Sequence, residues 1–381
     1  MNSIYFDHAA TTPMHAAAIE AYVEAASAGP SNPSSLHAAG RAARERISVA
    51  RDALAEALGC SPTELVFTGG GTESDNSALF GAARAQRLKG RSGIVTTAVE
   101  HHAVLNACRQ LEAEGFELTI LPVDEHGVVR LEDAESAINE NTAVVSVMAG
   151  NNETGTLQPI AKIGELARRH GAVMHVDAVQ AFGYLPIDFR ELPIDLLSVS
   201  AHKINGPQGV GLLYVRRGTP WLPMLYGGSQ ERSRRAGTEN VAGIAAFAAA
   251  AKLACLNRHN RWEHAESIRA EVLRQLSEQL GPERFVVNGH QDDRLPHVLN
   301  VSFPGISSES MLMNLDLAGV AASGGSACNS GSLKPSHVLE AMNLPSDRIV
   351  SAVRFSFGLG NTTDEAEKMV KIIATISARY A

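Results

Sequence analysis

Lys203 is the residue whose position first suggests covalent chemistry. It follows an apolar run at 194–199 and precedes Gly206 and Gly209, after which a second apolar run occupies 210–215. Two such runs predict buried strands, so Lys203 is expected at a strand end. A lysine amine beside glycines that let another group approach the backbone is suited to condense with a carbonyl compound. A lone lysine is more often an exposed loop residue, so other motifs must decide between these interpretations.

A glycine-rich stretch predicts a site for an anion. The apolar run 65–68 leads into Gly69, Gly70 and Gly71, and a helical pattern follows from Thr72. This order directs backbone N–H groups and the positive helix end at an anion such as a phosphate. The stretch is neither a dinucleotide fingerprint nor a P-loop, because the glycines are consecutive and no Gly-Lys-Ser/Thr follows. An ordinary turn capped by Thr72 is the alternative.

Two further segments place ionisable side chains after predicted strands. Asp177 ends the run 173–176, and a carboxylate there is costly to bury unless a positive group such as a protonated pyridine nitrogen meets it. Capping of the next turn would also explain it. His101 and His102 follow another strand, and adjacent histidines point in different directions. A shared metal site is therefore not expected, and one ring is better suited to stack on a flat ring or to move protons near it.

A thiol and a guanidinium complete the candidate chemistry. Cys328 stands in a segment of small residues at 321–331, so its thiol should be accessible and mobile. Arg354 lies on an alternating strand at 353–357, where its planar fork suits a substrate carboxylate, or else a structural ion pair. The polar loops at 151–155 and 227–238 are either solvated surface or parts of a site. The remaining cysteines fit inert packing: Cys60, Cys108 and Cys255.

Composition narrows the class of protein. The chain has 381 residues, 45% of them hydrophobic, with 33 Lys plus Arg against 41 Asp plus Glu. This size allows a large core, and the net charge of −8 without a basic run argues against nucleic acid as a direct ligand. We expect no membrane span, because the apolar stretch 241–254 is too short. Without a signal-like start or C-x-x-C pairs, a cytoplasmic location with reduced thiols is expected.

The order of predicted elements indicates an α/β fold. Helical patterns at 41–58, 102–114 and 159–170 alternate with strand-like runs, which predicts a mainly parallel seven-stranded sheet covered on both faces. The predicted strands are 65–68, 94–97, 118–123, 143–148, 173–176, 196–200 and 210–215. We expect a large domain at 13–256. A smaller α+β domain, 257–381, would be completed by an N-terminal arm, 1–12, and would carry the Cys328 segment.

Together these motifs, in this order and along essentially the whole chain, resemble the cysteine desulfurases, the class V aminotransferases related to the nitrogen-fixation and iron–sulfur-cluster enzymes. The fold this implies is the fold type I of pyridoxal-phosphate enzymes. The matching segments are Asp7-His-Ala-Ala-Thr-Thr-Pro13, Asn32-Pro-Ser-Ser35, Thr72-Glu-Ser-Asp-Asn76, Glu100-His101, Asn151-Asn-Glu153, Asp177-Ala-Val-Gln180, Ser200-Ala-His-Lys203, Arg235-Ala-Gly-Thr238, Gly325-Ser-Ala-Cys328 and Arg354-Phe-Ser356.

The resemblance implies a set of residue roles around pyridoxal 5′-phosphate. Lys203 would hold it covalently, Asp177 would meet its pyridine nitrogen, His101 would stack on its ring and Gln180 would lie near its phenolic oxygen. Asn152 would lie near ring and substrate, and Arg354 would bind the substrate carboxylate. The residues expected around the phosphate are Gly71, Thr72, Ser200 and His202, joined by Thr238 from the other subunit of a homodimer.

The implied reaction converts L-cysteine to L-alanine and leaves the sulfur on Cys328 as a persulfide. Lys203 would move the Cα proton, and a positive group, for which His101 is the first candidate, would favour the Cys328 thiolate. No resident metal is expected, and Cys328 would be at most a transient iron–sulfur ligand. The implied partners are L-cysteine and a sulfur-acceptor protein, either an iron–sulfur scaffold or a tRNA thiolase.

Two departures from the family pattern affect the expected partners. The segment Ser323-Gly-Gly-Ser-Ala-Cys-Asn329 replaces the usual Ser-Ser-Gly-Ser-Ala-Cys-Thr, which predicts a looser loop with the chemistry retained. The sequence ends at Ala381 without the tail that docks the scaffold protein of the housekeeping enzyme, so a tRNA-thiolation role is an equal candidate. Two alternatives remain: a lyase or aminotransferase of the same fold that does not use Cys328, and a non-catalytic sulfur-carrier platform.

Overall fold

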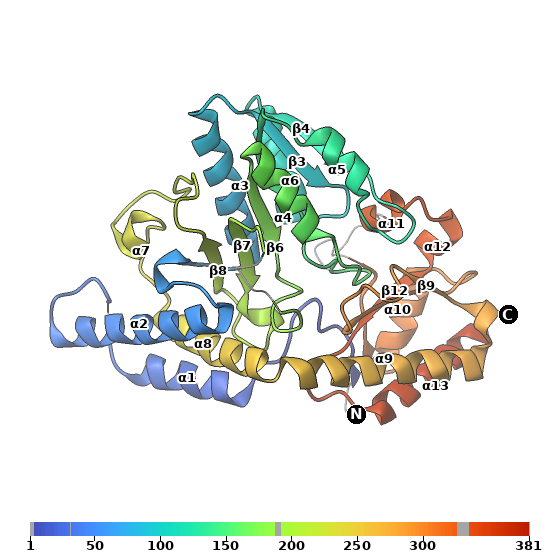
Figure 1. Cartoon of the computed structure of the whole chain (residues 1–381). Helices are drawn as coiled ribbons and strands as arrows, with labels where there is room; N and C mark the ends of the chain where they lie inside the picture. Colours follow the sequence, from blue (N-terminus) through green and yellow to red (C-terminus); the bar gives the residue numbers. More distant parts are fainter. Residues whose placement is uncertain (1–3, 31, 187–191, 326–334, 381) are drawn as a thin grey trace.

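The computed structural model describes residues 4–30, 32–186, 192–325 and 335–380. In this part of the chain, seven strands form a sheet in the order β2-β8-β7-β6-β5-β3-β4 (Figure 1). Only β8 runs antiparallel to its neighbours there. The predicted strands are confirmed, with ends shifted by at most two residues. They are β2 Leu65–Thr68, β3 Gly93–Thr97, β4 Glu117–Leu121, β5 Thr142–Ser146, β6 Val173–Asp177, β7 Leu196–Ser200 and β8 Gly211–Val215.

Helices cover both faces of this sheet. Along β6, Val173 packs in the cluster that contains α3 and α4, whereas Met174 points into the cluster on the other face, which contains α2, α6 and α8. Both faces are therefore buried, as the apolar runs predicted. The helices of this part are α1 Ala16–Ser27, α2 Ala38–Leu58, α3 Gly71–Arg87, α4 His102–Ala113, α5 Leu131–Ala137, α6 Ile160–His170, α7 Gln230–Ser233 and α8 Val241–Leu256, with the short 3₁₀ helices η1 Pro62–Glu64 and η2 Ala201–Lys203.

A second sheet and a second core lie beyond α8. Strands β9 Val286–Asn288, β10 Val298–Ser302 and β12 Ala352–Ser356 are antiparallel in the order β12-β10-β9, and β1 Ile4–Tyr5 pairs with β11 Val320–Ala321. Figure 1 shows α9 running along this region beside α13. The helices here are α9 Arg258–Leu280, α10 Ser308–Leu317, α11 His337–Ala341, α12 Ser346–Val350 and α13 Thr363–Ser377, with η3 Pro282–Arg284.

The N-terminal arm belongs to this second core. Ile4 and Phe6 are buried with side chains of α9, β10, β12 and α13. By contrast, Val338 and Leu339 of α11 pack into the core of the large sheet. The division into 13–256 and 1–12 plus 257–381 stays a prediction. The two cores support it in part, since Ala265, Leu295 and Ala352 also pack into the core of the large sheet.

Two helices have well-defined caps. Helix α2 buries its apolar face and ends at Gly59, whose φ of 69° is the left-handed conformation that glycine adopts without strain. Helix α13 begins with a reciprocal capping box between Thr362 and Glu365. Among the described residues, no single helix is long and apolar enough to cross a membrane. Helices α8 and α9 pass that test of length and composition only together, as a pair bent by 74°.

Candidate active site

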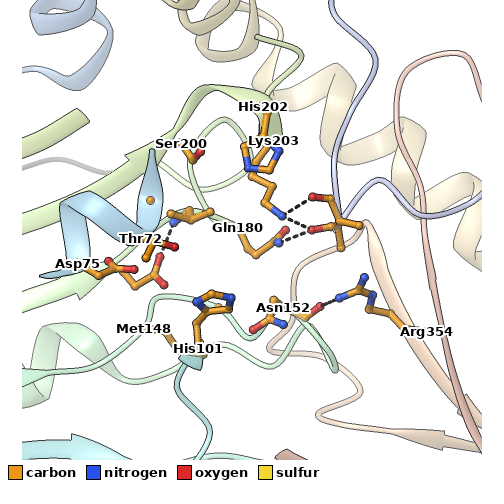
Figure 2. A pocket seen from close by; sticks show the side chains of 16 residues that line it. Thr72, Asp75, His101, Met148, Asn152, Gln180, Ser200, His202, Lys203 and Arg354 are labelled. Carbon is orange, nitrogen blue, oxygen red and sulfur yellow. Dashed lines mark hydrogen bonds between the residues drawn. The ribbon is translucent and has the colours of Figure 1, made fainter. Parts of the chain in front are cut away.

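A cavity of about 220 Å³ lies beyond the carboxyl ends of β5, β6 and β7. Ligands of open α/β sheets bind at this edge, because several strand ends and the loops after them converge there. Figure 2 shows Lys203, Ser200 and His202 on one side of the cavity and His101 and Asn152 on the other. The predicted residues that line it are Gly71, Thr72, His101, Asn152, Asp177, Gln180, Ser200, His202, Lys203 and Arg354.

Two predicted residues are not placed in this cavity. Thr238 lines a separate cavity of about 140 Å³ together with Gly69 and Arg235. Cys328 lies outside the described residues, so its distance from the cavity is not part of the structure.

Lys203 is a cavity residue and not an exposed loop lysine. It ends η2 directly after β7, is half-buried, and its Nζ donates hydrogen bonds to the carbonyl oxygens of Ala9 at 2.5 Å and Ala10 at 2.7 Å. The N-terminal arm therefore holds the ammonium group in the cavity. Gly206 permits the tight turn behind it, since a Cβ there would lie 2.9 Å from both Cβ and O of Ala201.

Asp177 both caps a turn and lines the cavity. The capping interpretation is confirmed, and the contact with a cationic ring nitrogen stays a prediction. Its Oδ1 accepts a hydrogen bond from the N–H of Val179 at 2.9 Å. Burial raises the pKa of Asp177 to about 6, against the lowering effects of that hydrogen bond and of the Lys203 charge. The carboxyl group is consequently mostly ionised at neutral pH and is suited to meet a cationic ring nitrogen.

His101 is the N-cap residue of α4. Its Nδ1 accepts a hydrogen bond from the N–H of Ala103 at 3.1 Å. Burial, and then the positive charges of Lys203, His102 and His337, lower the pKa of His101 to about 4. Burial beside a lysine favours the neutral ring, which does not support a positive charge on His101. Its effect on the Cys328 thiol stays a prediction, because Cys328 lies outside the described residues. His102 points elsewhere, with its ring 4.5 Å from that of His337.

Arg354 on β12 is 1% exposed and joins the two sheets at the cavity. Its guanidinium donates to Oδ1 of Asp7 at 2.9 Å and to the carbonyl oxygen of Asn152 at 2.9 Å. The Nε of Arg354 has no hydrogen-bond partner among the described residues. The ion-pair alternative is thus observed, while the residue still borders the cavity where a substrate carboxylate would be bound.

The glycine-rich stretch forms the start of α3. The N-cap residue is Gly70 with φ of 146°, and no side chain caps the helix, so the alternative of a turn capped by Thr72 is wrong. The first N–H groups of a helix have no intrahelical acceptor and can bind an anion. Gly71 must stay small, because its Cβ would lie 2.9 Å from Cγ2 of Val179. Ser200 and His202 border the same end of the cavity.

The comparisons with known proteins agree with this geometry. Residues 4–369 match the family described as Aminotransferase class-V. A candidate cysteine desulfurase of the IscS type from Bacillus subtilis is 48% identical over 380 residues and covers 100% of both chains. The chain belongs to the cysteine desulfurase group of the class V aminotransferases. A cysteine desulfurase IscS of Dictyoglomus turgidum is 43% identical, over 98% of this chain and 96% of its own.

Solved structures show the same fold. A NifS-like protein superposes with a TM-score of 0.91 at 35% identity, covering 99% of this chain and 100% of its own. A structure described as SspA in complex with cysteine gives a TM-score of 0.81 at 35% identity, covering 93% and 99% of the two chains. The predicted class V fold is therefore confirmed.

The cofactor of class V desulfurases is pyridoxal phosphate, and the residues present fit it. The cavity brings together the buried carboxyl group of Asp177, the uncapped start of α3 and the amine of Lys203. These features match a ring nitrogen, a phosphate and an aldehyde. Among the described residues no group of three His, Cys, Asp or Glu side chains could hold a metal ion.

Sequence reasoning assigned no role to three buried polar residues at this site: Asp75, Glu100 and His175. Asp75 lines the cavity one helical turn after Gly71. His175 lies two residues before Asp177 on β6 and so points to the same face of the sheet. Both periodicities could have identified these residues in the sequence.

Proposed function

We propose that this class V chain is a pyridoxal-phosphate-dependent cysteine desulfurase that converts L-cysteine to L-alanine and collects the sulfur on Cys328 as a persulfide. The observation that carries this proposal is the single cavity that unites Lys203, the buried Asp177 and the uncapped start of α3 in a chain 43% to 48% identical to such enzymes over nearly its full length. The solved relative with bound cysteine supports the substrate.

Pyridoxal phosphate, when bound, supplies an electron sink for the substrate carbon. We assign Lys203 to hold it covalently and then, once displaced, to move the proton at the substrate Cα. The Ala9 and Ala10 carbonyl oxygens keep the lysine amine oriented toward the cavity. Ionised Asp177 would favour protonation of the ring nitrogen, and the neutral ring of His101 would stack on the cofactor.

The substrate and phosphate contacts come from the two sheets together. Arg354 binds the substrate carboxylate while its ion pair with Asp7 fixes the orientation of the guanidinium. Asn152 lies beside ring and substrate, and Gln180, whose Nε2 donates to Ala9, reaches the phenolic oxygen. The groups proposed to hold the phosphate are Gly71, Thr72, Ser200 and His202.

Sulfur transfer is the step assigned to Cys328. Its thiolate attacks the substrate sulfur, so that a sulfur–sulfur bond forms while the carbon–sulfur bond breaks. The electron pair of the broken bond goes to the carbon skeleton, which is protonated and leaves as alanine. The persulfide on Cys328 can then be passed to an acceptor protein.

The proposed assembly is a cytoplasmic homodimer. Thr238 lies outside the Lys203 cavity of its own chain, which agrees with its contributing to the phosphate site of a partner subunit. The IscS names of the relatives support delivery to iron–sulfur cluster assembly. A tRNA-thiolation enzyme is the other candidate acceptor.

The Cys328→Ala variant tests the proposal. We expect it to lose the persulfide and nearly all alanine formation from cysteine, while it still binds the cofactor. The control is Cys255→Ala, because burial raises the pKa of Cys255 and keeps that thiol unreactive. Undiminished turnover in Cys328→Ala would instead favour a lyase that releases sulfide.

A further inference from the structure

A row of polar side chains crosses the sheet beneath the cavity. On the face that packs against α3, strands β5, β6 and β7 bury apolar residues first, namely Val144, Val173 and Leu196. Two residues further along each strand, the same face carries Ser146, His175 and Ser198, all with 0% exposure. Polar groups so deeply buried require hydrogen-bond partners.

These side chains form a continuous hydrogen-bonded chain. His175 Nδ1 lies 2.8 Å from Ser146 Oγ, and His175 Nε2 lies 3.0 Å from Ser198 Oγ. Burial lowers the pKa of His175 to about 3, so the ring is neutral and has one N–H donor and one acceptor nitrogen. Ser198 also hydrogen-bonds to the carboxyl group of Asp75. The chain thus leads from the interior of the sheet to Asp75.

Asp75 brings a second carboxyl group to the Asp177 end of the cavity. It is 1% exposed, and its Oδ1 has no hydrogen-bond partner among the described residues. The nearest basic atom recorded for it is His175 Nε2 at 3.6 Å, on a neutral ring. Burial, and then the charge of Asp177, raise the pKa of Asp75 well above its usual value, against the lowering effect of the hydrogen bond with Ser198; Glu100 adds a smaller raising contribution.

The direction of the hydrogen-bonded chain depends on the charge of Asp75. If Asp75 is ionised, Ser198 donates to it, His175 donates through Nε2 and Ser146 donates to Nδ1. If Asp75 is neutral, its proton is donated to Ser198, Ser198 donates to Nε2 and Nδ1–H donates to Ser146. Both arrangements satisfy the hydrogen bonds of the His175 ring. The arrangement with ionised Asp75, however, leaves two buried negative charges, on Asp75 and Asp177, close together, which is unfavourable at low dielectric.

We propose that Asp75 is a positioning residue that holds a proton at neutral pH and, through Ser198 and His175, leaves Asp177 as the single ionised carboxylate facing the cofactor nitrogen. This inference rests on the proposed role of Asp177 toward the cofactor. The proton stays on Asp75 throughout the reaction, so the chain of hydrogen bonds fixes charge and orientation and transfers nothing.

Infrared difference spectroscopy of the cofactor-free protein tests the protonation state directly. Subtracting the spectrum of Asp75→Asn from that of the unmodified protein at neutral pH should reveal the carbonyl stretch of a protonated carboxylic acid. In an Asp177→Asn background the midpoint at which this band disappears should move to lower pH, because the neighbouring negative charge is gone. Absence of the band at neutral pH would overturn the proposal. Asp292→Asn, at an exposed position, is the control for unspecific changes.

Titration with pyridoxal phosphate tests the positioning role. Asparagine can donate to Ser198 as the neutral acid does. Asp75→Asn should therefore change the cofactor dissociation constant by less than about threefold, and the pH midpoint of the cofactor absorbance by less than about 0.5 pH unit. Asp75→Ala leaves the chain without its donor and should weaken cofactor binding about tenfold. If Asp75→Asn were as damaging as Asp177→Asn, Asp75 would be a second charged residue and the proposal would be wrong.

The two measurements separate the two levels of inference. The infrared band is recorded without cofactor and substrate, so it does not depend on desulfurase activity. Conversely, a protein that bound no pyridoxal phosphate would refute the proposed function even if Asp75 carried its proton. Thermal unfolding of Asp75→Asn and Asp75→Ala shows whether either variant is folded before cofactor is added.

Discussion

The two ends of the cavity are built in different ways. At one, the buried end, the carboxyl groups of Asp177 and Asp75 are 7% and 1% exposed and lie against the sheet. At the other, the start of α3 offers backbone N–H groups, and the cavity adjoins an open hollow of about 660 Å³ bordered by Gly70, Thr72 and Gln208.

This difference separates two kinds of recognition. At the buried end, the identity and charge of each side chain matter, because a carboxyl group removed from water changes its pKa with every neighbouring charge. At the open end, helix geometry supplies the donors, and water can replace a lost side-chain hydroxyl. We therefore expect substitutions to have graded effects that depend on the end at which they lie.

The largest effect is expected for Lys203→Ala, which removes the amine proposed to attach the cofactor. Covalent cofactor and its absorbance should be lost, and turnover of cysteine should fall by about 10³-fold or more, because both attachment and proton transfer depend on this amine. The measurement is the absorbance spectrum together with alanine release. Lys162→Ala, at an exposed position on α6, should change neither; retained colour in Lys203→Ala would refute the assignment.

Asp177→Asn should be the most damaging change at the buried end. It removes the charge that favours a protonated ring nitrogen, so turnover should fall about 10²- to 10³-fold. The cofactor should still attach to Lys203, with an altered pH dependence of its absorbance. Turnover close to that of the unmodified enzyme would show that the buried carboxyl group is structural only.

Gly71→Ala tests the backbone geometry of the open end. The added Cβ would lie 2.9 Å from Cγ2 of Val179, so Val179 or the helix start must move. Overpacking of this kind costs about 1–3 kcal/mol, which corresponds to a cofactor dissociation constant raised by about fivefold to 100-fold. The double variant Gly71→Ala, Val179→Ala should recover part of the affinity. No recovery would mean that the methyl group interferes with the phosphate itself.

The stability of the cofactor-free protein should depend on pH through Glu100. Burial raises the pKa of this carboxyl group from 4.5 to about 8. Between these two values the folded state binds a proton that the unfolded state has already released. The free energy of unfolding therefore falls as the pH rises from 4.5 to about 8, by at most about 1.4 kcal/mol per pH unit. Glu100→Gln should flatten the fall in Tm between about pH 7 and pH 8, whereas Glu165→Gln, at an exposed position, should not.

The smallest effect is expected for Thr72→Ala. Thr72 is exposed at the open end, so losing one hydroxyl there should weaken cofactor binding only about two- to fivefold, equivalent to about 0.5–1 kcal/mol. Spectral titration with pyridoxal phosphate measures this, with Thr375→Ala as a surface control. A loss comparable to that of Gly71→Ala would contradict the distinction between the two ends.

Much of this molecule could be predicted from the sequence. Apolar runs and helical periodicity identified the strands of the large sheet and the helices between them, because both patterns reflect which face of each element is buried. The resemblance to cysteine desulfurases implied that Lys203, Asp177 and the start of α3 share one cofactor, and all three line one cavity where the carboxyl ends of the strands converge. Those predictions concern local structure and topology.

Only the tertiary structure decided which charges the side chains at the cavity carry and which residues they contact. The pairing of Arg354 with Asp7 joins residues 347 positions apart, and the contact of Asp75 with Ser198 and His175 needs α3 packed across three strands. His101 is neutral because it is buried beside Lys203. Solvation and Coulomb forces depend on distances between segments remote in the sequence, so no local pattern could determine them.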